Sequence, residues 1–122
     1  MPASRVHLAC VVIDCQDPAA MAAFYQAAGG GEITRNDADS AWVSMAGTTL
    51  VLRRVADHCP PTWPAPDVPI QMHMDFLVDD LREAERELHG YGATTAAHQP
   101  PGQGLIVMLD PAGHPFCIAS RR

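Results

Sequence analysis

The sequence lacks a long hydrophobic run and has few basic residues. The longest apolar stretch near its start, residues 8–13, is too short for a signal-peptide core or a membrane span, and no small-residue cleavage site follows it. Lysine and arginine number 8 against 14 acidic residues, the net charge is -6, and no basic cluster is larger than a pair. We therefore expect a soluble, cytoplasmic protein that binds neither membranes nor nucleic acid.

Cysteine is present, but without CxxC spacing. The four cysteines are Cys10, Cys15, Cys59 and Cys117, and three of them lie in or beside apolar stretches. Reduced cysteines commonly serve as small buried hydrophobic residues in cytosolic proteins. We therefore expect free thiols and no disulfide framework.

The first half of the chain has the pattern of one strand, one helix and several strands. Residues 6–13 are apolar and β-branched, which predicts a strand. Asp17 and Pro18 are typical of a helix start, and the glycines from Gly29 onward indicate its end. Residues 40–45 and 48–55 predict two further strands, and a weaker strand is indicated at 32–34.

The same pattern begins again after a proline-rich connector. Residues 59–69 contain five prolines, which excludes a helix interior or a central strand. A strand at 70–78, a helix after Asp80, and strands at 105–110 and 116–120 then follow. At 122 residues we expect a single domain over 1–122, with module one at about 4–58, the connector at 59–69 and module two at about 70–121.

Three stretches of this repeat carry a family resemblance. They are "DPAAMAAFYQAAGG", "WPAPDVPIQMHMDFLVDDLREAERELHGYGAT" and the closing "LDPAGHPFCIAS", and they follow one another in order between residues 17 and 120. In them the chain resembles the vicinal oxygen chelate (VOC) superfamily, which includes glyoxalase, dioxygenase and bleomycin resistance proteins, and most of all its short glyoxalase-like members. The resemblance implies an α+β fold, in which two βαβββ modules form paired curved sheets around a cleft. It also implies a small-molecule ligand and a homodimer.

The metal-dependent members of this superfamily place four ligands, usually His and Glu, in the cleft. Counting from Asp17, Asp80 and the turn glycines puts Cys10, Val51, His73 and Cys117 at the corresponding positions. Only the histidine matches the usual pattern, and valine cannot bind a metal. The resemblance therefore implies no metal cofactor as the first choice, with Zn²⁺ held by Cys10, His73 and Cys117 as the alternative.

Strand alternation adds polar residues to these positions. Thr49 and Arg53 share the face of Val51, and Asp75 shares the face of His73. Asp75 can orient the imidazole or act as a base, or it can form an ion pair with Arg53 that holds the modules together. We predict His73 and Asp75 as the catalytic candidates. The predicted ligand-binding residues are Cys10, Thr49, Val51, Arg53, His73, Asp75 and Cys117.

Three functional hypotheses remain open. The first is a metal-independent protein that binds a small, largely apolar or aromatic metabolite. The second is a metal-dependent enzyme of the lyase, epimerase or dioxygenase type with an atypical Cys/His zinc site, or an enzyme that uses a His73/Asp75 acid-base pair. The third is a structural or regulatory homodimer with a vestigial cleft. The missing carboxylates favour the first hypothesis over the second.

Overall fold

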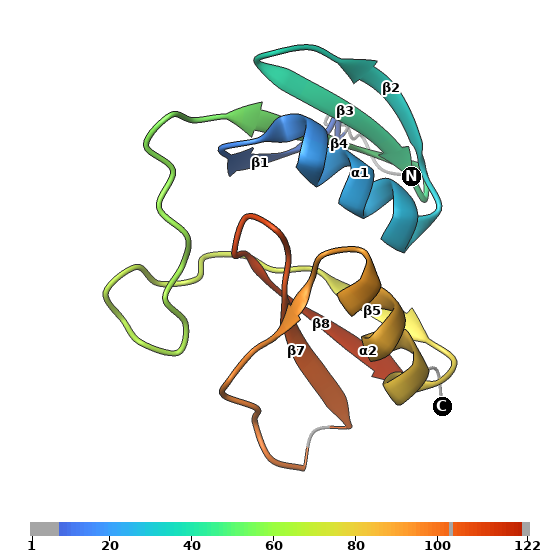
Figure 1. Cartoon of the computed structure of the whole chain (residues 1–122), viewed down its shortest axis with the longest axis vertical. Coiled ribbons are helices and arrows are strands. Elements are labelled where there is room, and N and C mark those ends of the chain that lie inside the picture. Colours follow the sequence, from blue (N-terminus) through green and yellow to red (C-terminus); the bar gives the residue numbers. More distant parts are fainter. Residues whose placement is uncertain (1–7, 103, 121–122) are drawn as a thin grey trace, which may run out of the picture. The chain divides into compact units, whose positions relative to one another are not determined.

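The computed structural model describes residues 8–102 and 104–120. The chain divides into two compact units, Met1–His58 and Cys59–Arg122, which Figure 1 draws in blue to green and in green to red. In the described part of the chain, no helix is long and apolar enough to cross a membrane. Each unit is described below by itself.

The first unit is a four-stranded sheet with one helix. Its elements are β1 (Val11–Cys15), α1 (Pro18–Gly29), β2 (Glu32–Asn36), β3 (Ser40–Met45) and β4 (Thr48–Arg54). The strand order is β1-β4-β3-β2, in which β1 runs parallel to β4 and the other pairs are antiparallel. Parallel strands need a crossover connection, and α1 with the β2–β3 hairpin supplies it.

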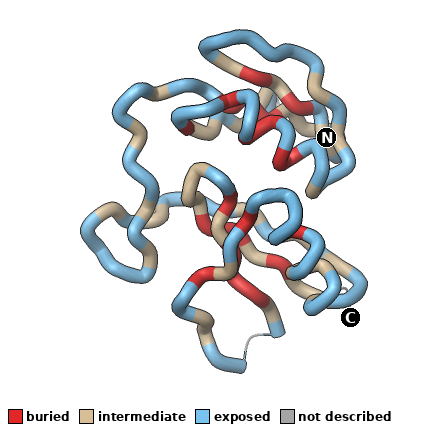
Figure 2. Tube along the Cα trace, in the orientation of Figure 1, coloured by how far each residue is buried: buried red, intermediate tan, exposed pale blue. Residues whose placement is uncertain are grey.

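Helix α1 begins and ends where its sequence signals predict. The Asp17 side chain accepts a hydrogen bond from the Ala20 backbone N–H at 3.1 Å, and Gly30 ends the helix in the left-handed conformation. Met21, Phe24 and Tyr25 are buried against the sheet, as the apolar spacing indicates. The red segments of Figure 2 show this core between α1 and the strands beside it.

The second unit repeats this plan. Its elements are β5 (Asp75–Val78), α2 (Leu81–Gly90), β6 (Thr94–Thr95), β7 (Leu105–Leu109) and β8 (Pro115–Ser120). The strand order is β5-β8-β7-β6, with β5 parallel to β8 and the other pairs antiparallel. Asp80 caps α2 as Asp17 caps α1, by accepting from the Glu83 backbone N–H. The predicted α+β fold of two βαβββ modules is therefore confirmed.

Three element boundaries differ from the prediction. Strand β1 begins at Val11 and reaches Cys15, because β4 offers partners as far as Arg54. The predicted strand at 70–78 is present only from Asp75, so His73 precedes it. Residues 94 and 95, for which no strand was predicted, form β6 on the edge of β7. The expected strand residues 6 and 7 lie outside the described part of the chain.

The proline-rich connector has neither helix nor strand, as predicted, and belongs to the second unit. It is held there at two points. The ring of Trp63 lies edge-on to that of His98, with centroids 5.3 Å apart. Pro60 packs so closely on Gly113 that a Cβ atom at Gly113 would come within 2.7 Å of it.

Candidate functional site: a histidine, an aspartate and a thiol beside β5

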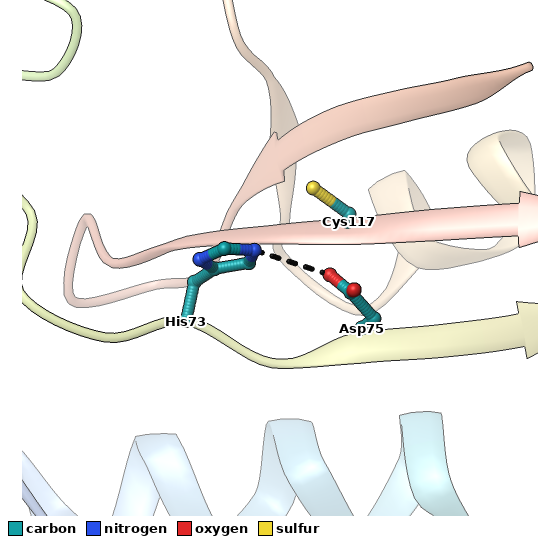
Figure 3. Close-up of side chains that lie close together, drawn as sticks. All are labelled: His73, Asp75 and Cys117. Carbon is teal, nitrogen blue, oxygen red and sulfur yellow. Dashed lines mark ion pairs between the residues drawn. The ribbon is translucent and has the colours of Figure 1, made fainter. Parts of the chain in front are cut away.

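Three potential ligand side chains lie together in the second unit. His73 stands just before β5, Asp75 is the first residue of β5, and Cys117 lies on β8. One ligand atom from each lies within 4.8 Å of the other two. Figure 3 shows the three side chains grouped around the start of β5. We call His73, Asp75 and Cys117 the polar trio.

Strand register explains why the polar trio forms. Asp75 and Cys117 are direct partners across the parallel β5–β8 pair, so their side chains lie on one face of the sheet. The pairing extends one residue before β5, because the Cys117 backbone N–H donates to the Met74 carbonyl at 2.9 Å. The same register brings His73 opposite Pro115, which has no N–H to donate. The hydrogen-bonded pairing of β5 with β8 therefore starts only after His73, and His73 lies outside the strand.

Asp75 interacts with both other members of the trio. Its Oδ1 lies 3.3 Å from His73 Nε2, and both side chains are about half exposed or more, at 67% and 47%. Burial raises the pKa of the Cys117 thiol, and the charge and hydrogen bonding of Asp75 raise this pKa further. The raised pKa favours the thiol form of Cys117 over the thiolate. The trio offers a neutral donor, a carboxylate and an imidazole.

An apolar row continues the same sheet face next to the trio. Leu77, two residues after Asp75, is paired with Ala119, and Ala119 is paired with Leu105 on the other side. Leu77 is 66% exposed, which is unusual for a leucine in a strand. The alternate residues of β8, Phe116 and Ile118, are buried in the core on the opposite face. The face that carries the trio is thus half polar and half apolar.

The other predicted site residues lie in the first unit. Thr49, Val51 and Arg53 alternate along β4 and share one sheet face, as predicted. Val51 is buried, and Cys10 is half-buried just before β1. The predicted ligand-binding residues come from both modules. Their grouping in one cleft stays a prediction.

Arg53 and Asp75 each lie beside a side chain of opposite type within their own unit. Arg53 Nη2 lies 2.9 Å from Asp14 Oδ1, and Arg53 Nε donates to the same oxygen at 3.1 Å. Asp14 was not predicted as a site residue, and it is the register partner of Arg53 across β1 and β4. The predicted first strand ended at residue 13, so Asp14 fell outside it and nothing in the sequence indicated this pair. Asp75 has His73 as its ion-pair partner.

The sequence model of the glyoxalase-like domain family matches residues 10–119. This range includes both units almost entirely, with the polar trio inside it. The chain belongs to the glyoxalase-like domain family. It is thereby a member of the VOC superfamily, as the sequence resemblance predicted. No protein of curated function matches the chain.

Solved structures of the glyoxalase-like group share the fold over almost the full length of the chain. The fosfomycin resistance protein FosX of Listeria monocytogenes has a TM-score of 0.71 at 16% identity, covering 98% of this chain and 96% of FosX. A glyoxalase/bleomycin resistance protein/dioxygenase family enzyme from Burkholderia phytofirmans PsJN has a TM-score of 0.71 at 18% identity, covering 94% and 98%. A glyoxalase-related enzyme from Fulvimarina pelagi has a TM-score of 0.67 at 22% identity, covering 94% and 88%. At these identities the likeness shows the fold alone.

Within this glyoxalase-like fold, two of the four expected ligand positions fall in the polar trio. His73 and Cys117 were reached by counting, and the structure brings them within 4.8 Å of each other and of Asp75. Asp75 was predicted as a partner of the imidazole but not as a possible metal ligand. The register of β5 with β8 was the missing information, because it makes Asp75 a neighbour of the thiol as well.

Proposed function

We propose that this glyoxalase-like protein binds a small, largely apolar or aromatic metabolite, and that binding requires no His/Glu metal centre. The observation that carries the proposal is the composition of one sheet face, where the polar trio adjoins the exposed apolar row of Leu77. A small-molecule site commonly combines an apolar wall with a few convergent polar groups. His73 and Asp75 orient the polar end of the ligand, and Leu77 contacts its apolar part. The remaining predicted contacts are Cys10, Thr49, Val51 and Arg53 of the first unit.

The missing carboxylates support a site without the usual metal centre. Cysteine and valine occupy positions where the metal-dependent members of the superfamily usually carry glutamate or histidine, and Val51 has no ligand atom. The raised pKa of Cys117 acts in the same direction, because a metal binds the thiolate and not the thiol. A neutral thiol is instead suited to donate a hydrogen bond to an organic ligand.

A metal-dependent enzyme of the lyase, epimerase or dioxygenase type is the second candidate. The observation that favours it is the proximity of one nitrogen, one oxygen and one sulfur ligand atom in the trio. These three donors fit a zinc ion, which accepts His, carboxylate and Cys ligands and in catalytic sites keeps a fourth position open. Zinc bound there would polarise a substrate oxygen. His73 and Asp75 would hold or move a proton in an enzyme without metal.

The proposal also includes the assembly of the chain. We propose that both modules form one domain, with a ligand cleft between them, and that the protein is a cytoplasmic homodimer. Large apolar side chains are exposed in each unit, with Val12 at 49% and Leu77 at 66%, and such surface is commonly covered by a ligand or a partner. Sedimentation velocity over a range of concentrations checks the homodimer.

The test of the proposed function uses N-phenyl-1-naphthylamine, an uncharged aromatic dye with one N–H donor, whose fluorescence rises on binding. We expect saturable binding to the metal-free protein, and a loss of affinity of about tenfold in Asp75→Asn and in His73→Ala, since a hydrogen bond to a charged group contributes about 1.5–3 kcal/mol. Asp67→Asn, at an exposed position in the connector, is the matched control. Equal dye affinity in the wild type and all three variants would show that the polar trio is not part of the ligand site.

A further inference from the structure

The strands of the second sheet carry one charged side chain, and it is a carboxylate. In the strands β5 to β8, Asp75 is the one acidic residue, and neither lysine nor arginine is present. Arg82 and Arg86 lie on α2, where Arg82 Nη1 is 3.0 Å from Glu85 Oε1. The Asp75 side chain is 67% exposed. The strands themselves therefore bring no permanent cation to this carboxylate.

Asp75 also differs from other carboxylates in its ion-pair partner. Asp14 and Asp37 each pair with an arginine, at 2.9 and 3.2 Å, and a guanidinium always carries its charge. Asp75 pairs with His73, whose ring is charged only when it is protonated. Figure 3 shows the carboxylate turned toward this imidazole. Whenever His73 is neutral, the negative charge of Asp75 is not compensated by its ion-pair partner.

The Cys117 thiol already responds to this negative charge. Burial raises the pKa of Cys117 most, and the charge of Asp75 raises this pKa further. A second anion beside Asp75 is thus disfavoured, and the same electrostatic effect favours a cation there. The thiol form of Cys117 adds a neutral hydrogen-bond donor and leaves the charge of Asp75 in place.

The exposed apolar row lies at a definite distance from the carboxylate. Leu77 is two residues beyond Asp75 on the same sheet face, which places the row about 7 Å along the strand. The row runs from Leu77 through Ala119 to Leu105 across three neighbouring strands, a width of about 10 Å. These dimensions suit a molecule of one or two rings whose charged group is joined to the ring by a short link.

We infer that the ligand is an organic cation: a protonated amine that pairs with Asp75 and whose apolar or aromatic body lies on the row of Leu77. The inference rests on the proposed function and deepens it, because it assigns a positive charge to the polar end of that ligand. The ammonium N–H groups donate to the carboxylate in charge-assisted hydrogen bonds. A ligand with a carboxylate at the same end is repelled by Asp75.

Isothermal titration calorimetry of the full-length protein with three naphthalene probes tests this inference. The probes are 1-naphthylmethylamine, which is protonated at neutral pH, the uncharged 1-naphthalenemethanol and the anionic 1-naphthoate. We expect the amine to bind at least fivefold more tightly than the alcohol, since the ion pair is partly exposed, and the naphthoate to bind more weakly than the alcohol. Asp75→Asn should bring the amine and the alcohol within about twofold of each other, and Asp75→Glu should keep the preference for the amine.

Three controls separate the charge from the apolar contact. Asp67→Asn removes a carboxylate at an exposed position of the same unit and should keep the preference for the amine. Leu77→Ala should weaken the binding of the amine and the alcohol alike, so that their ratio stays unchanged, because Leu77 contacts the part that both share. Methylammonium has the charge without the ring and should not compete with 1-naphthylmethylamine.

The probe titrations and the dye titration distinguish failure of this inference from failure of the proposed function. Equal affinity for the amine and the alcohol in the wild type, a preference for the amine that survives Asp75→Asn, or effective competition by methylammonium overturns the inference. If this happens while the uncharged dye still binds and loses affinity in Asp75→Asn, the proposed function stands. If neither the dye nor any probe binds, the proposed function fails and the inference fails with it.

Discussion

Replacing Thr95 by valine should destabilise the second unit in a pH-dependent manner. Thr95 lies in the short edge strand β6, and its hydroxyl donates to Glu85 Oε2 of α2 at 2.7 Å. His89 Nε2, also on α2, lies 2.8 Å from the same hydroxyl oxygen. A hydroxyl has one proton, which Glu85 receives, so His89 must be the donor in the second bond. The two bonds fasten α2 to the edge of the sheet.

The size of the effect follows from what valine cannot do. Valine keeps the shape of threonine but loses the hydroxyl, and with it the hydrogen bond to a carboxylate. The Glu85 side chain is 17% exposed and is also bound by Arg82 at 3.0 Å, so water and Arg82 compensate part of the loss. We therefore expect the free energy of unfolding to fall by about 1–2 kcal/mol at neutral pH.

The pH dependence has a defined sign. The Thr95 hydrogen bond is the largest cause that holds the pKa of Glu85 below its ordinary value, followed by the effects of Arg82 and, last, His89, while burial acts the other way. A carboxyl with a lowered pKa in the folded state stabilises the fold above its unfolded pKa of about 4.3. This stabilisation is lost as the pH falls through the folded pKa. The difference between wild type and Thr95→Val should therefore shrink as the pH falls below about 4.

Urea unfolding at several pH values between about 7 and 3 measures this difference. Thr94→Val, in the exposed neighbouring position of β6, is the matched control, because it makes the same change of residue type on the same strand. We expect it to alter stability by less than about 0.5 kcal/mol. Equal effects at both positions, or a Thr95→Val effect that does not change with pH, would refute the role of the Glu85 bond.

Three further substitutions test other parts of the structure. Gly31→Ala should destabilise the first unit or prevent its folding, as measured by urea unfolding, because the added Cβ would overlap a backbone carbonyl oxygen of β3. Gln99→Leu should cost about 1–3 kcal/mol in the same assay, because the Gln99 side chain bonds both the N–H and the carbonyl of buried Val107. Asp75→Asn should shift the pH profile of Cys117 alkylation to lower pH, because Asp75 raises the pKa of this thiol. An unchanged profile would show that Asp75 does not act on the Cys117 thiol.

The fold was largely predictable because its signals are local. The caps at Asp17 and Asp80 and the apolar spacing of α1 are set by residues a few positions apart, and both helices begin where these signals predict. Strand ends were less predictable because they depend on the partner strand. Strand β5 begins after His73 because Pro115 stands opposite, and no feature of residues 70–78 alone contains that information.

The candidate site was predictable in its members but not in its grouping. Counting from the helix caps identified His73 and Cys117, and alternation added Asp75. Counting residues from the helix caps finds corresponding positions in the two modules. It does not show which of the side chains at these positions lie close together. The structure groups Asp75 with Cys117 and pairs Arg53 with Asp14, both through strand register across residues that are distant in sequence.

The register that builds the polar trio is itself set by the hydrophobic core. Phe116 and Ile118 flank Cys117 and are 2% and 0% exposed, so both must stay on the buried face. Successive residues of a strand lie on opposite faces. A slip of β8 by one residue would therefore expose the side chains of Phe116 and Ile118 and would bury that of Cys117 in the core. The position of the thiol beside Asp75 is therefore a consequence of burying its two neighbours. Substitutions within the core at these two positions should consequently disturb the trio without touching any of its members.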